Sequence, residues 1–585
     1  MRIFIAALIL SYHSISGSGT QDFVKCEVIL ARPDVVYFNA GRLLGVAPGE
    51  TFEIYYDGVA VAAGKIAWAD KYVSRSEELD PADVAGMNYS DRLTARINLF
   101  AAEANKGGWL TVPFLSELNL EPASIKTPDE KMIGRLIHRG LLSRDANGQI
   151  IPDLAGNFEE RGLTYTFYIN PEAKFHSGKP VEASDVAYSF ERLALSPRLT
   201  TAGNYVLMIK GAEEFRHRMK NEMSGLFLID KNTISVTLKE PFPAFEDYLA
   251  GPGGYIVPRP GLEAPGNNVI GAGIYKIKWR NPDGLTLEPF ADDLTSAHLD
   301  SIHFVRFKSI DDAGLSFELG RLDLITTLGE PPPKFISGGR ETSMITSTIC
   351  SAVLGINGLR DFQRDLSFSK ALTYLLDRET IIRVILGGSG RMPEDLTVGY
   401  GYDQVNVNPD SADYYFAKIE KLPQAVSLYV DSNYPSLISV ARYIAGQLQS
   451  RGIKVKEKKA DLSSLEDDRT RSDIDLYLNY HNPVSPDPDC ELYPLYSYLL
   501  SGQTNYLFSR DGALQESLSL LRRETDPERR EILAAGLRYS LIKEPPAIIL
   551  FEPYLTTIFK NDVSGVRPLE EGYLDLRGAF IEADK

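Results

Sequence analysis

The chain has 585 residues, of which 44% are hydrophobic and 24% are charged. This composition is typical of a folded globular protein and excludes a largely disordered chain, which cannot bury enough apolar surface to offset the entropy lost on ordering. The longest uninterrupted apolar run, Ile3 to Leu10, is far shorter than the roughly 20 residues that span a bilayer, which excludes a polytopic membrane protein. The formal net charge of −17 argues against nucleic acid as a partner, because phosphates would be repelled.

Residues 1–19 predict a secretory signal peptide. Arg2 precedes the short apolar run, and small and polar residues follow it. A buried first strand is the alternative interpretation of this stretch. Cys26 follows Phe-Val-Lys rather than small apolar residues, so a lipid anchor is not predicted. We therefore expect an exported, periplasmic protein.

Residues 26–80 predict a small all-β module that resembles a barrel. Short runs rich in β-branched and aromatic residues, such as Val35–Phe38 and Glu53–Tyr56, alternate with turn signals. Asp57-Gly58 between two such runs is typical of a hairpin. The pattern resembles small β-modules of bacterial envelope proteins.

Residues 81–108 predict a linker helix that ends at Gly107-Gly108, because apolar residues recur at helical spacing before these glycines. From Trp109 to the end of the chain, strand and helix signals alternate. Helices are expected over Arg364–Leu386 and Pro435–Leu448, and a strand over Asp473–Leu478. This alternation predicts an α/β body.

The motifs of common enzymes are missing. The sequence has no Gly-x-Ser-x-Gly, no His-Glu-x-x-His and no phosphate-binding loop. His298 and His303 are the histidines that come close together, and their spacing fits neither one face of a helix nor one face of a strand. We therefore expect no catalytic residue, no metal site and no cofactor, and a hydrolase is the least favoured function.

The sequence contains three cysteines, too few for a disulfide framework in a chain of this length. Cys350 and Cys490 could pair in an oxidising compartment. Two buried free thiols are the favoured alternative.

Residues 137–193 contain a dense series of motifs: Gly140-Leu141, Asn147-Gly148, Thr164-Tyr-Thr-Phe167, Phe175-His176-x-Gly178 and Ala183-x-Asp185-Val186. This series resembles the extracytoplasmic solute-binding proteins that serve peptide and nickel ABC importers. Further matches in the same order include Gly271-Ala-Gly-Ile-Tyr275, Leu354-Gly-Ile-Asn357 and Ser369–Arg378. The likeness covers about residues 109–585.

The turn, strand and helix signals in this stretch agree with the resemblance. Asn147-Gly148 suits a hairpin turn, and Leu163–Ile169 alternates like a half-buried strand. Ser184 or Asp185 is expected to cap the helix that follows. Phe175-His176 is expected to belong to the core rather than to contact a ligand.

The resemblance implies an α/β, two-lobed periplasmic binding protein fold, type II-like and of the large peptide-binding class, preceded by the β-module. Lobe I would contain residues 109–340, with a subdomain, and lobe II residues 341–550, while residues 551–585 return to lobe I. Such a protein is not an enzyme. It binds a small-molecule or peptide-like ligand in the interlobe cleft, closes on it by hinge motion and delivers it to an ABC permease in the inner membrane.

One loop departs from the family. Its peptide binders have a Trp, then an Asp three residues later, then Asp-Pro, and that Asp pairs with the ligand's α-amino group. Aligning Asp487-Pro488 places His481 at the Trp position and Val484 at the Asp position. The sequence thus predicts a ligand that is N-blocked, anionic or less polar, or a lost ligand function. The residues expected to line the cleft are Asn357, Tyr480, His481, Asn482, Asn505 and Tyr506.

Two functions follow from these observations. The first is the solute-binding receptor of an ABC importer. The second is a diverged envelope sensor or scaffold, in which residues 26–80 contact another envelope protein or the cell wall. The altered loop and the added module favour the second function without displacing the first.

Overall fold

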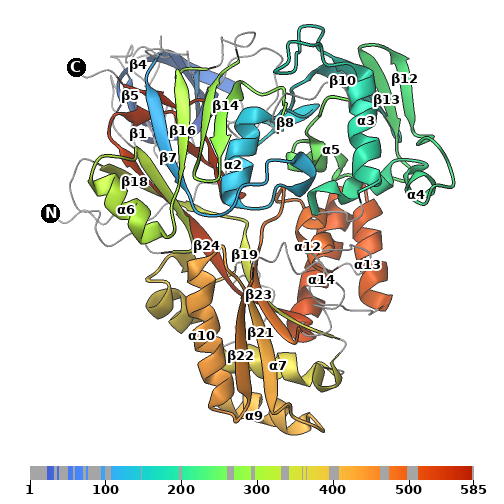
Figure 1. Ribbon diagram of the computed structural model, residues 1–585, viewed down its shortest axis with the longest axis vertical. Coiled ribbons are helices and arrows are strands. Elements are labelled where there is room, and N and C mark those ends of the chain that lie inside the picture. The colour runs from blue at the N-terminus through green and yellow to red at the C-terminus, as the bar shows by residue number, and fades with distance from the viewer. Residues whose placement is uncertain are drawn as a thin grey trace.

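The structure is a computed structural model, and it has two parts: an upper body and a lower lobe (Figure 1). The residues that it describes are 23–31, 36–38, 51–56, 59–69, 74–76, 94–98, 107–145, 148–196, 201–259, 269–290, 297–330, 341–358, 360–363, 365–393, 407–460, 474–496 and 512–582. The predicted signal peptide lies outside these residues.

The N-terminal module consists of six strands: β1 (Phe23–Ala31), β2 (Val36–Phe38), β3 (Thr51–Tyr56), β4 (Val59–Ala69), β5 (Ser74–Ser76) and β6 (Thr94–Asn98). They pair in the order β1-β2-β5-β4-β3-β6, and β6 pairs back with β1, so the sheet closes on itself. Phe38 and Phe52 pack inside it, with ring centroids 4.7 Å apart.

The predicted linker helix over residues 81–108 is wrong where the structure describes it, because Thr94–Asn98 is strand β6. This strand forms antiparallel ladders with both β1 and β3. Without it, both neighbours would expose unpaired backbone groups along one edge. Tertiary pairing therefore overrides the helical spacing of the apolar residues, and the module extends to residue 98.

The upper body contains two four-stranded sheets. One has the order β14 (Tyr275–Asn281), β15 (Gly284–Pro289), β16 (Ser301–Arg306) and β7 (Trp109–Phe114), with β16 and β7 parallel. The other forms a subdomain with the order β10 (Ala155–Arg161), β11 (Thr164–Ile169), β13 (Thr233–Thr237) and β12 (Leu226–Asp230). The upper-body helices are α2 (Pro128–Ile137), α3 (Ala183–Ala194), α4 (Ala212–Arg216), α5 (Phe245–Leu249) and α6 (Ile310–Glu318).

The strand predicted over Leu163–Ile169 is confirmed as β11, whereas the predicted helix cap is not. Helix α3 begins at Ala183, two residues before Asp185. The Asp185 carboxylate instead accepts a hydrogen bond from the backbone N–H of Glu182, 2.9 Å away. Asp185 therefore provides a hydrogen-bond acceptor for a free backbone N–H from inside the first turn. It does not act as the cap residue that precedes the helix.

The Phe175-His176 pair belongs to the core. Phe175 is fully buried, and the His176 ring lies between two backbone groups: Nδ1 is 3.3 Å from the N–H of Gly271 and Nε2 is 2.9 Å from the carbonyl oxygen of Gly273. A Cβ on Gly271 would lie 1.9 Å from the Ile137 carbonyl oxygen, so the glycine permits close packing against the end of α2.

The lower lobe is built on the strands β19 (Ser351–Ile356), β23 (Leu476–His481), β21 (Ala425–Asp431) and β22 (Lys454–Ala460), in that order. Its helices are α7 (Ser367–Leu375), α8 (Arg378–Thr380), α9 (Pro409–Lys418), α10 (Pro435–Gln449), α12 (Pro488–Tyr496), α13 (Gly512–Arg523) and α14 (Pro527–Lys543). Helices and a strand are thus confirmed where residues 364–386, 435–448 and 473–478 predicted them.

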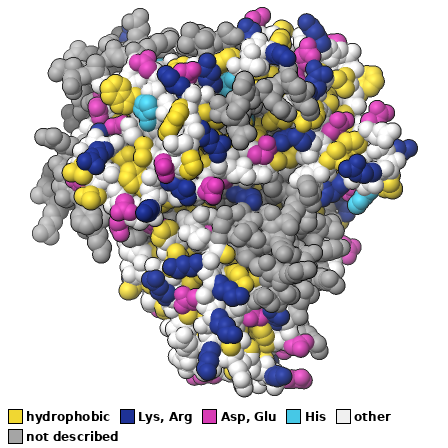
Figure 2. All heavy atoms as spheres, viewed as in Figure 1, with side chains coloured by type: hydrophobic (Ala, Val, Ile, Leu, Met, Phe, Trp, Pro, Cys, Tyr) yellow, Lys and Arg dark blue, Asp and Glu magenta, His cyan; other side chains and the backbone are white. Residues whose placement is uncertain are grey.

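The edge of this sheet is strand β22, which pairs with β21 and exposes the side chains of Lys454, Lys456 and Lys459. Figure 2 shows Lys and Arg side chains over the lower lobe, where α10 and β22 lie. Lysines on an edge strand discourage pairing with the edges of other molecules.

Strand β24 (Ala547–Lys560) joins the two parts. Its first half pairs with β19, and its second half pairs with β17 (Leu324–Leu328) and β18 (Glu341–Ser347). Figure 1 shows β24 passing from the lower lobe into the upper body. Since β18 lies beside the upper half, we place the crossings at residues 348–350 and 552–553, where the Thr348 hydroxyl donates to the Pro553 carbonyl at 2.6 Å.

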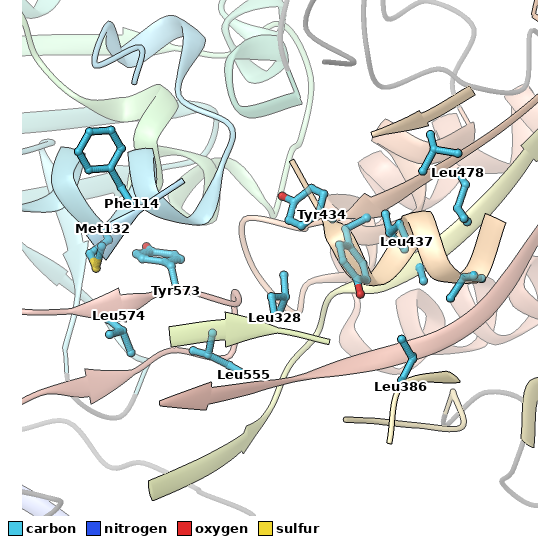
Figure 3. Packing of buried hydrophobic residues seen from close by; sticks show 14 of the residues in the cluster. Phe114, Met132, Leu328, Leu386, Tyr434, Leu437, Leu478, Leu555, Tyr573 and Leu574 are labelled. Atoms are coloured by element: carbon cyan, nitrogen blue, oxygen red, sulfur yellow. The ribbon is translucent and has the colours of Figure 1, made fainter. Parts of the chain in front are cut away.

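The remaining short strands are β8 (Leu142–Arg144), β9 (Ile150–Pro152), β20 (Gly390–Arg391), β25 (Val563–Ser564), β26 (Arg567–Pro568), β27 (Leu574–Asp575) and β28 (Phe580–Ile581). The chain thus returns to the upper body after β24. One buried hydrophobic cluster continues from the upper body into the lower lobe. In Figure 3, Leu328 and Leu555 lie between the upper-body side chains Met132 and Leu574 and the lower-lobe side chain Leu437.

A buried ionic cluster anchors the C-terminal segment to α2. The Asp575 carboxylate accepts from Arg135 at 3.0 Å, from Arg567 at 2.8 Å and from Arg577 at 2.9 Å. Although burial opposes its charge, the guanidinium groups keep the pKa of Asp575 well below its ordinary value. A buried charge needs such partners to be stable.

We predict that Asp575→Asn lowers the free energy of unfolding by about 3–5 kcal/mol, because removing one partner leaves buried guanidinium groups uncompensated. Urea denaturation measures this. The control is Glu159→Gln, which removes the exposed pair with Arg161 and should cost less than about 1 kcal/mol. Equal effects of the two substitutions would contradict the structural role of Asp575.

His138 makes stability depend on pH. Its side chain is 1% exposed, its Nε2 lies 3.0 Å from the Leu120 carbonyl oxygen, and burial lowers its pKa to about 4. The unfolded chain, with an ordinary His pKa near 6.5, binds a proton first as the pH falls. The stabilising contribution of the neutral ring is therefore complete above about pH 6.5 and is lost between about pH 6.5 and 4.

We accordingly predict that wild type loses about 2–3 kcal/mol more stability than His138→Gln between about pH 7.5 and 4.5. The glutamine amide can still donate to Leu120 but does not titrate. Urea denaturation at both pH values measures the difference. Parallel losses in the two proteins would show that His138 is protonated without cost in the fold.

Candidate ligand site between the lobes

Strand β23 ends in the loop of residues 482–487, which leads into α12 and faces the subdomain of the upper body. Tyr480 lies near the end of β23 and is 3% exposed. Its hydroxyl is 3.1 Å from the Ser436 hydroxyl, and its ring meets Tyr434 and Phe551 edge to face at centroid distances of 4.8 and 5.9 Å. Tyr480 thus packs in the core beside the expected cleft.

Two further predicted cleft residues have partners inside the protein. The His481 Nε2 lies 2.7 Å from the Glu491 carbonyl oxygen, and burial lowers the pKa of this ring to about 4. The Asn357 amide donates to the Ile474 carbonyl at 2.8 Å. Both side chains are buried, so their contact with a ligand stays a prediction.

Asn482 is half-buried at the start of the loop. Its side chain hydrogen-bonds with the Tyr434 hydroxyl, while its Oδ1 is buried with no hydrogen-bond partner among the described residues. Because a buried acceptor without a donor is costly, this oxygen is suited to a ligand donor. Asn505 and Tyr506 lie outside the described residues.

The position expected for an amine-binding carboxylate is occupied by Val484. This side chain is 7% exposed and belongs to the hydrophobic cluster of the subdomain. Its Cβ would lie 3.4 Å from a Cβ built on Gly251, which shows how closely the loop approaches the subdomain. Val484 offers no charge to a ligand ammonium group.

Polar contacts join the loop, α12 and α13 to the upper body, and we call this contact the interlobe seam. It comprises the Ser485 hydroxyl on the Asp247 carboxylate, the Tyr248 hydroxyl on Asp489 at 3.2 Å, and Arg522 on the Asn204 amide oxygen at 2.6 Å. Within the upper body, Arg144 also binds the Asp247 carboxylate. Arg522 also lies 3.7 Å from Asp489. The described conformation is therefore one in which the lobes touch.

A basic stripe on α2 was not predicted. Lys131 and Arg135 lie at i and i+4 in α2, His138 directly follows the helix, and all three are buried. The spacing of Lys131 and Arg135 places them on one helix face, and it is the sequence signal that could have identified them. Arg135 and His138 have the partners described above, whereas the Lys131 Nζ has no hydrogen-bond partner in the described part of the chain.

Cys350 lies at the crossing between the parts, close to Lys131. Burial raises the pKa of its thiol to about 12, although the nearby ammonium opposes the shift. The thiol is therefore protonated at neutral pH. Cys350 and Cys490 are both buried and free in the structure, so the two thiols are not paired there.

Other features do not compete with this site. Within the described ranges, no cluster of His, Cys, Asp or Glu could bind a metal ion, and no helix is long and apolar enough to cross a membrane. A cavity inside the lower lobe is lined by α14, β24 and the buried Arg378, among others. It involves one lobe, and the Arg378 guanidinium already donates to the Ile549 carbonyl at 3.0 Å.

The comparisons with known proteins agree with this geometry. The chain is 26% identical over 300 residues to the periplasmic oligopeptide-binding protein OppA of Escherichia coli (strain K12), which covers 48% of this chain and 54% of OppA. It is 20% identical over 471 residues to the glutathione-binding protein GsiB of Pectobacterium atrosepticum, which covers 76% of this chain and 89% of GsiB.

Solved structures share the fold. The murein tripeptide binding protein MppA of Escherichia coli superposes with a TM-score of 0.71 at 19% identity, over 81% of this chain and 99% of MppA. AgaA in complex with agropinic acid superposes with a TM-score of 0.69 at 22% identity, over 82% of this chain and 99% of AgaA.

The family model described as "Bacterial extracellular solute-binding proteins, family 5 Middle" matches residues 149–502, which is more than half of the chain. This range includes the subdomain, the crossing at residues 348–350 and the loop at 482–487. The two-lobed arrangement and this match lead to one conclusion: the chain belongs to the bacterial extracellular solute-binding proteins of family 5.

Proposed function

We propose that the protein is the periplasmic receptor of an ABC importer, which captures a peptide-like or other small solute between its lobes and delivers it to an inner-membrane permease. The observation that supports this function most is the family match over both lobes, in a fold whose parts are joined by two crossings. Binding and closure are the whole mechanism, and no chemical step is needed.

Closure has a physical basis in the interlobe seam. Its polar groups are solvated when the lobes are apart and pair with one another when the lobes meet. Such pairs contribute little net free energy, because the cost of removing charges from water offsets their attraction. A ligand that adds its own contacts to both lobes would therefore decide whether the closed form is populated.

We further propose that the ligand presents no free α-amino group at residue 484. An ammonium group buried beside the Val484 side chain would lack a counter-charge there and would be strongly disfavoured. The names of the relatives allow such a ligand: OppA is named for oligopeptides and GsiB for glutathione, and AgaA was solved with agropinic acid.

The sensor or scaffold function has less support. The family model begins at residue 149, so the module of residues 23–98 lies outside it. Contact of that module with an envelope protein or the cell wall stays a prediction.

Native mass spectrometry of protein purified from its own periplasm tests the receptor function. We expect a bound small molecule, seen as a discrete mass that leaves on collisional activation and is missing after unfolding and refolding. An empty cleft together with a stoichiometric protein partner would favour the sensor or scaffold and contradict the receptor.

Val484→Asp tests the proposal about the amine. The new carboxylate should raise the affinity for Ala-Ala-Ala about tenfold or more, because it supplies the missing counter-charge. Val484→Thr, which has nearly the same shape but no charge, should leave the affinity unchanged. Isothermal titration calorimetry measures both, and tight binding of Ala-Ala-Ala by the wild type would refute the proposal.

A further inference from the structure

The Lys131 ammonium group is the starting point. Lys131 lies in the first turn of α2 and is 6% exposed. Its Nζ has no hydrogen-bond acceptor among the described residues and sits 5.7 Å from the centroid of the buried Tyr573 ring. A ring face attracts a cation, but it does not replace the hydrogen bonds that an ammonium forms with water.

This position is unfavourable for a cation on two counts. Burial disfavours the charge and lowers the pKa of Lys131. In addition, the N-terminus of a helix has a partial positive charge, which favours anions in the first turn. The first-turn acids cannot compensate: Glu130 accepts from the backbone N–H groups of Asn119, Lys126 and Thr127, and Asp129 accepts from Leu115.

The other nearby groups do not neutralise this charge either. Glu571 attracts the ammonium but lies 3.9 Å from the guanidinium of Arg144, which shares its charge. The Cys350 thiol is protonated at neutral pH, as described above. The ammonium therefore lacks a close anion among the described residues.

Lys131 lies near the end of β23. The Tyr573 ring beneath its ammonium follows Gly572, and a Cβ built on Gly572 would lie 2.8 Å from the Cys350 sulfur. Cys350 in turn precedes Ser351, which pairs with His481 across the sheet. The next residue is Asn482, whose Oδ1 is buried without a donor. One unpartnered donor from the upper body and one unpartnered acceptor from the lower lobe thus lie beside the same crossing.

We propose that Lys131 binds the carboxylate of the ligand, and that the Asn482 amide oxygen accepts a hydrogen bond from an N–H group beside that carboxylate. This inference rests on the proposed receptor function and names its ligand class: a solute with a carboxylate next to an amide and without a free α-amino group. The C-terminus of an N-acylated peptide has this chemistry.

The acidic residues around the site favour a ligand group with a single negative charge. Glu570 lies beside the crossing, where its carbonyl oxygen accepts from the N–H of Ile349 at 2.9 Å, and burial together with the charge of Glu571 raises the pKa of its carboxyl group. A doubly charged phosphate would be repelled by these acids, whereas a carboxylate matches the one ammonium group.

The test uses the full-length protein and three probes: acetyl-Ala-Ala-Ala with a free carboxylate, the C-terminal amide of the same peptide, and Ala-Ala-Ala amide. Calorimetry near neutral pH should show that the free acid binds about tenfold more tightly than either amide. Lys131→Met should abolish this preference. Because methionine needs no counter-charge when buried, the variant should be at least as stable as the wild type.

The matched control is Lys239→Met, which changes the net charge equally but removes a surface pair with Glu213 at 2.8 Å. This variant should keep the preference for the free acid. Equal binding of acid and amide by the wild type, or a preference that Lys131→Met retains, would overturn the role of Lys131 and leave the receptor function standing.

A second measurement separates this inference from the receptor function. Crystals soaked in sodium bromide should give an anomalous peak beside the Lys131 ammonium in the wild type and none in Lys131→Met. If no probe peptide binds but this peak is present, the anion site stands and the peptide-like ligand of the proposed function is contradicted. Without the peak and without probe binding, the anion site is overturned.

Discussion

The two halves of β24 form their hydrogen bonds in two different places, residues 547–551 with β19 and residues 555–559 with β17 and β18. A buried backbone group that loses its partner costs more than most side-chain contacts contribute, so neither half can leave its sheet. The lobes are therefore tethered at a fixed point. Closure of the lobes in the proposed mechanism would therefore bend the chain near residues 348–350 and 552–553.

Buried charge decides what the space between the lobes can bind. Arg135 has a buried carboxylate partner, and Arg522 lies near one at the seam. These guanidinium groups hold neighbouring segments in place, and few of their hydrogen-bond donors are left for a ligand. Lys131 differs because it is equally buried but has no hydrogen-bond acceptor in the described part of the chain. A site that binds a charged ligand needs such an unpaired group. A charged group that already has a protein partner has replaced its hydrogen bonds to water with bonds to that partner.

The same fold is known with different ligands, as the names of OppA, GsiB and AgaA indicate. Backbone architecture thus leaves ligand chemistry open, and a few side chains decide it. In the binding mode proposed above, the decisive pair would be the aliphatic Val484 on the lower lobe and Lys131 on the upper body. Such a pair would suit the carboxylate end of a ligand rather than a free peptide amino terminus, because Val484 has no charge and the buried Lys131 side chain has no acceptor of its own in the described part of the chain.

The sequence alone identified the family through the resemblance of its motifs, and it indicated the α/β body and the N-terminal β-strands because turn residues and hydrophobic periodicity act over a few neighbouring residues. Alignment of Asp487-Pro488 with the family loop also predicted that Val484 stands at the position of the amine-binding Asp. The sequence failed at β6, where pairing with β1 and β3 outweighs local helical spacing, and at Asp185, which caps from inside the helix. Periodicity also could not distinguish Lys131 from Arg135 on the same helix face. Only the tertiary structure placed Asp575 beside one and no acceptor beside the other, because the partners of a buried charge come from segments hundreds of residues away.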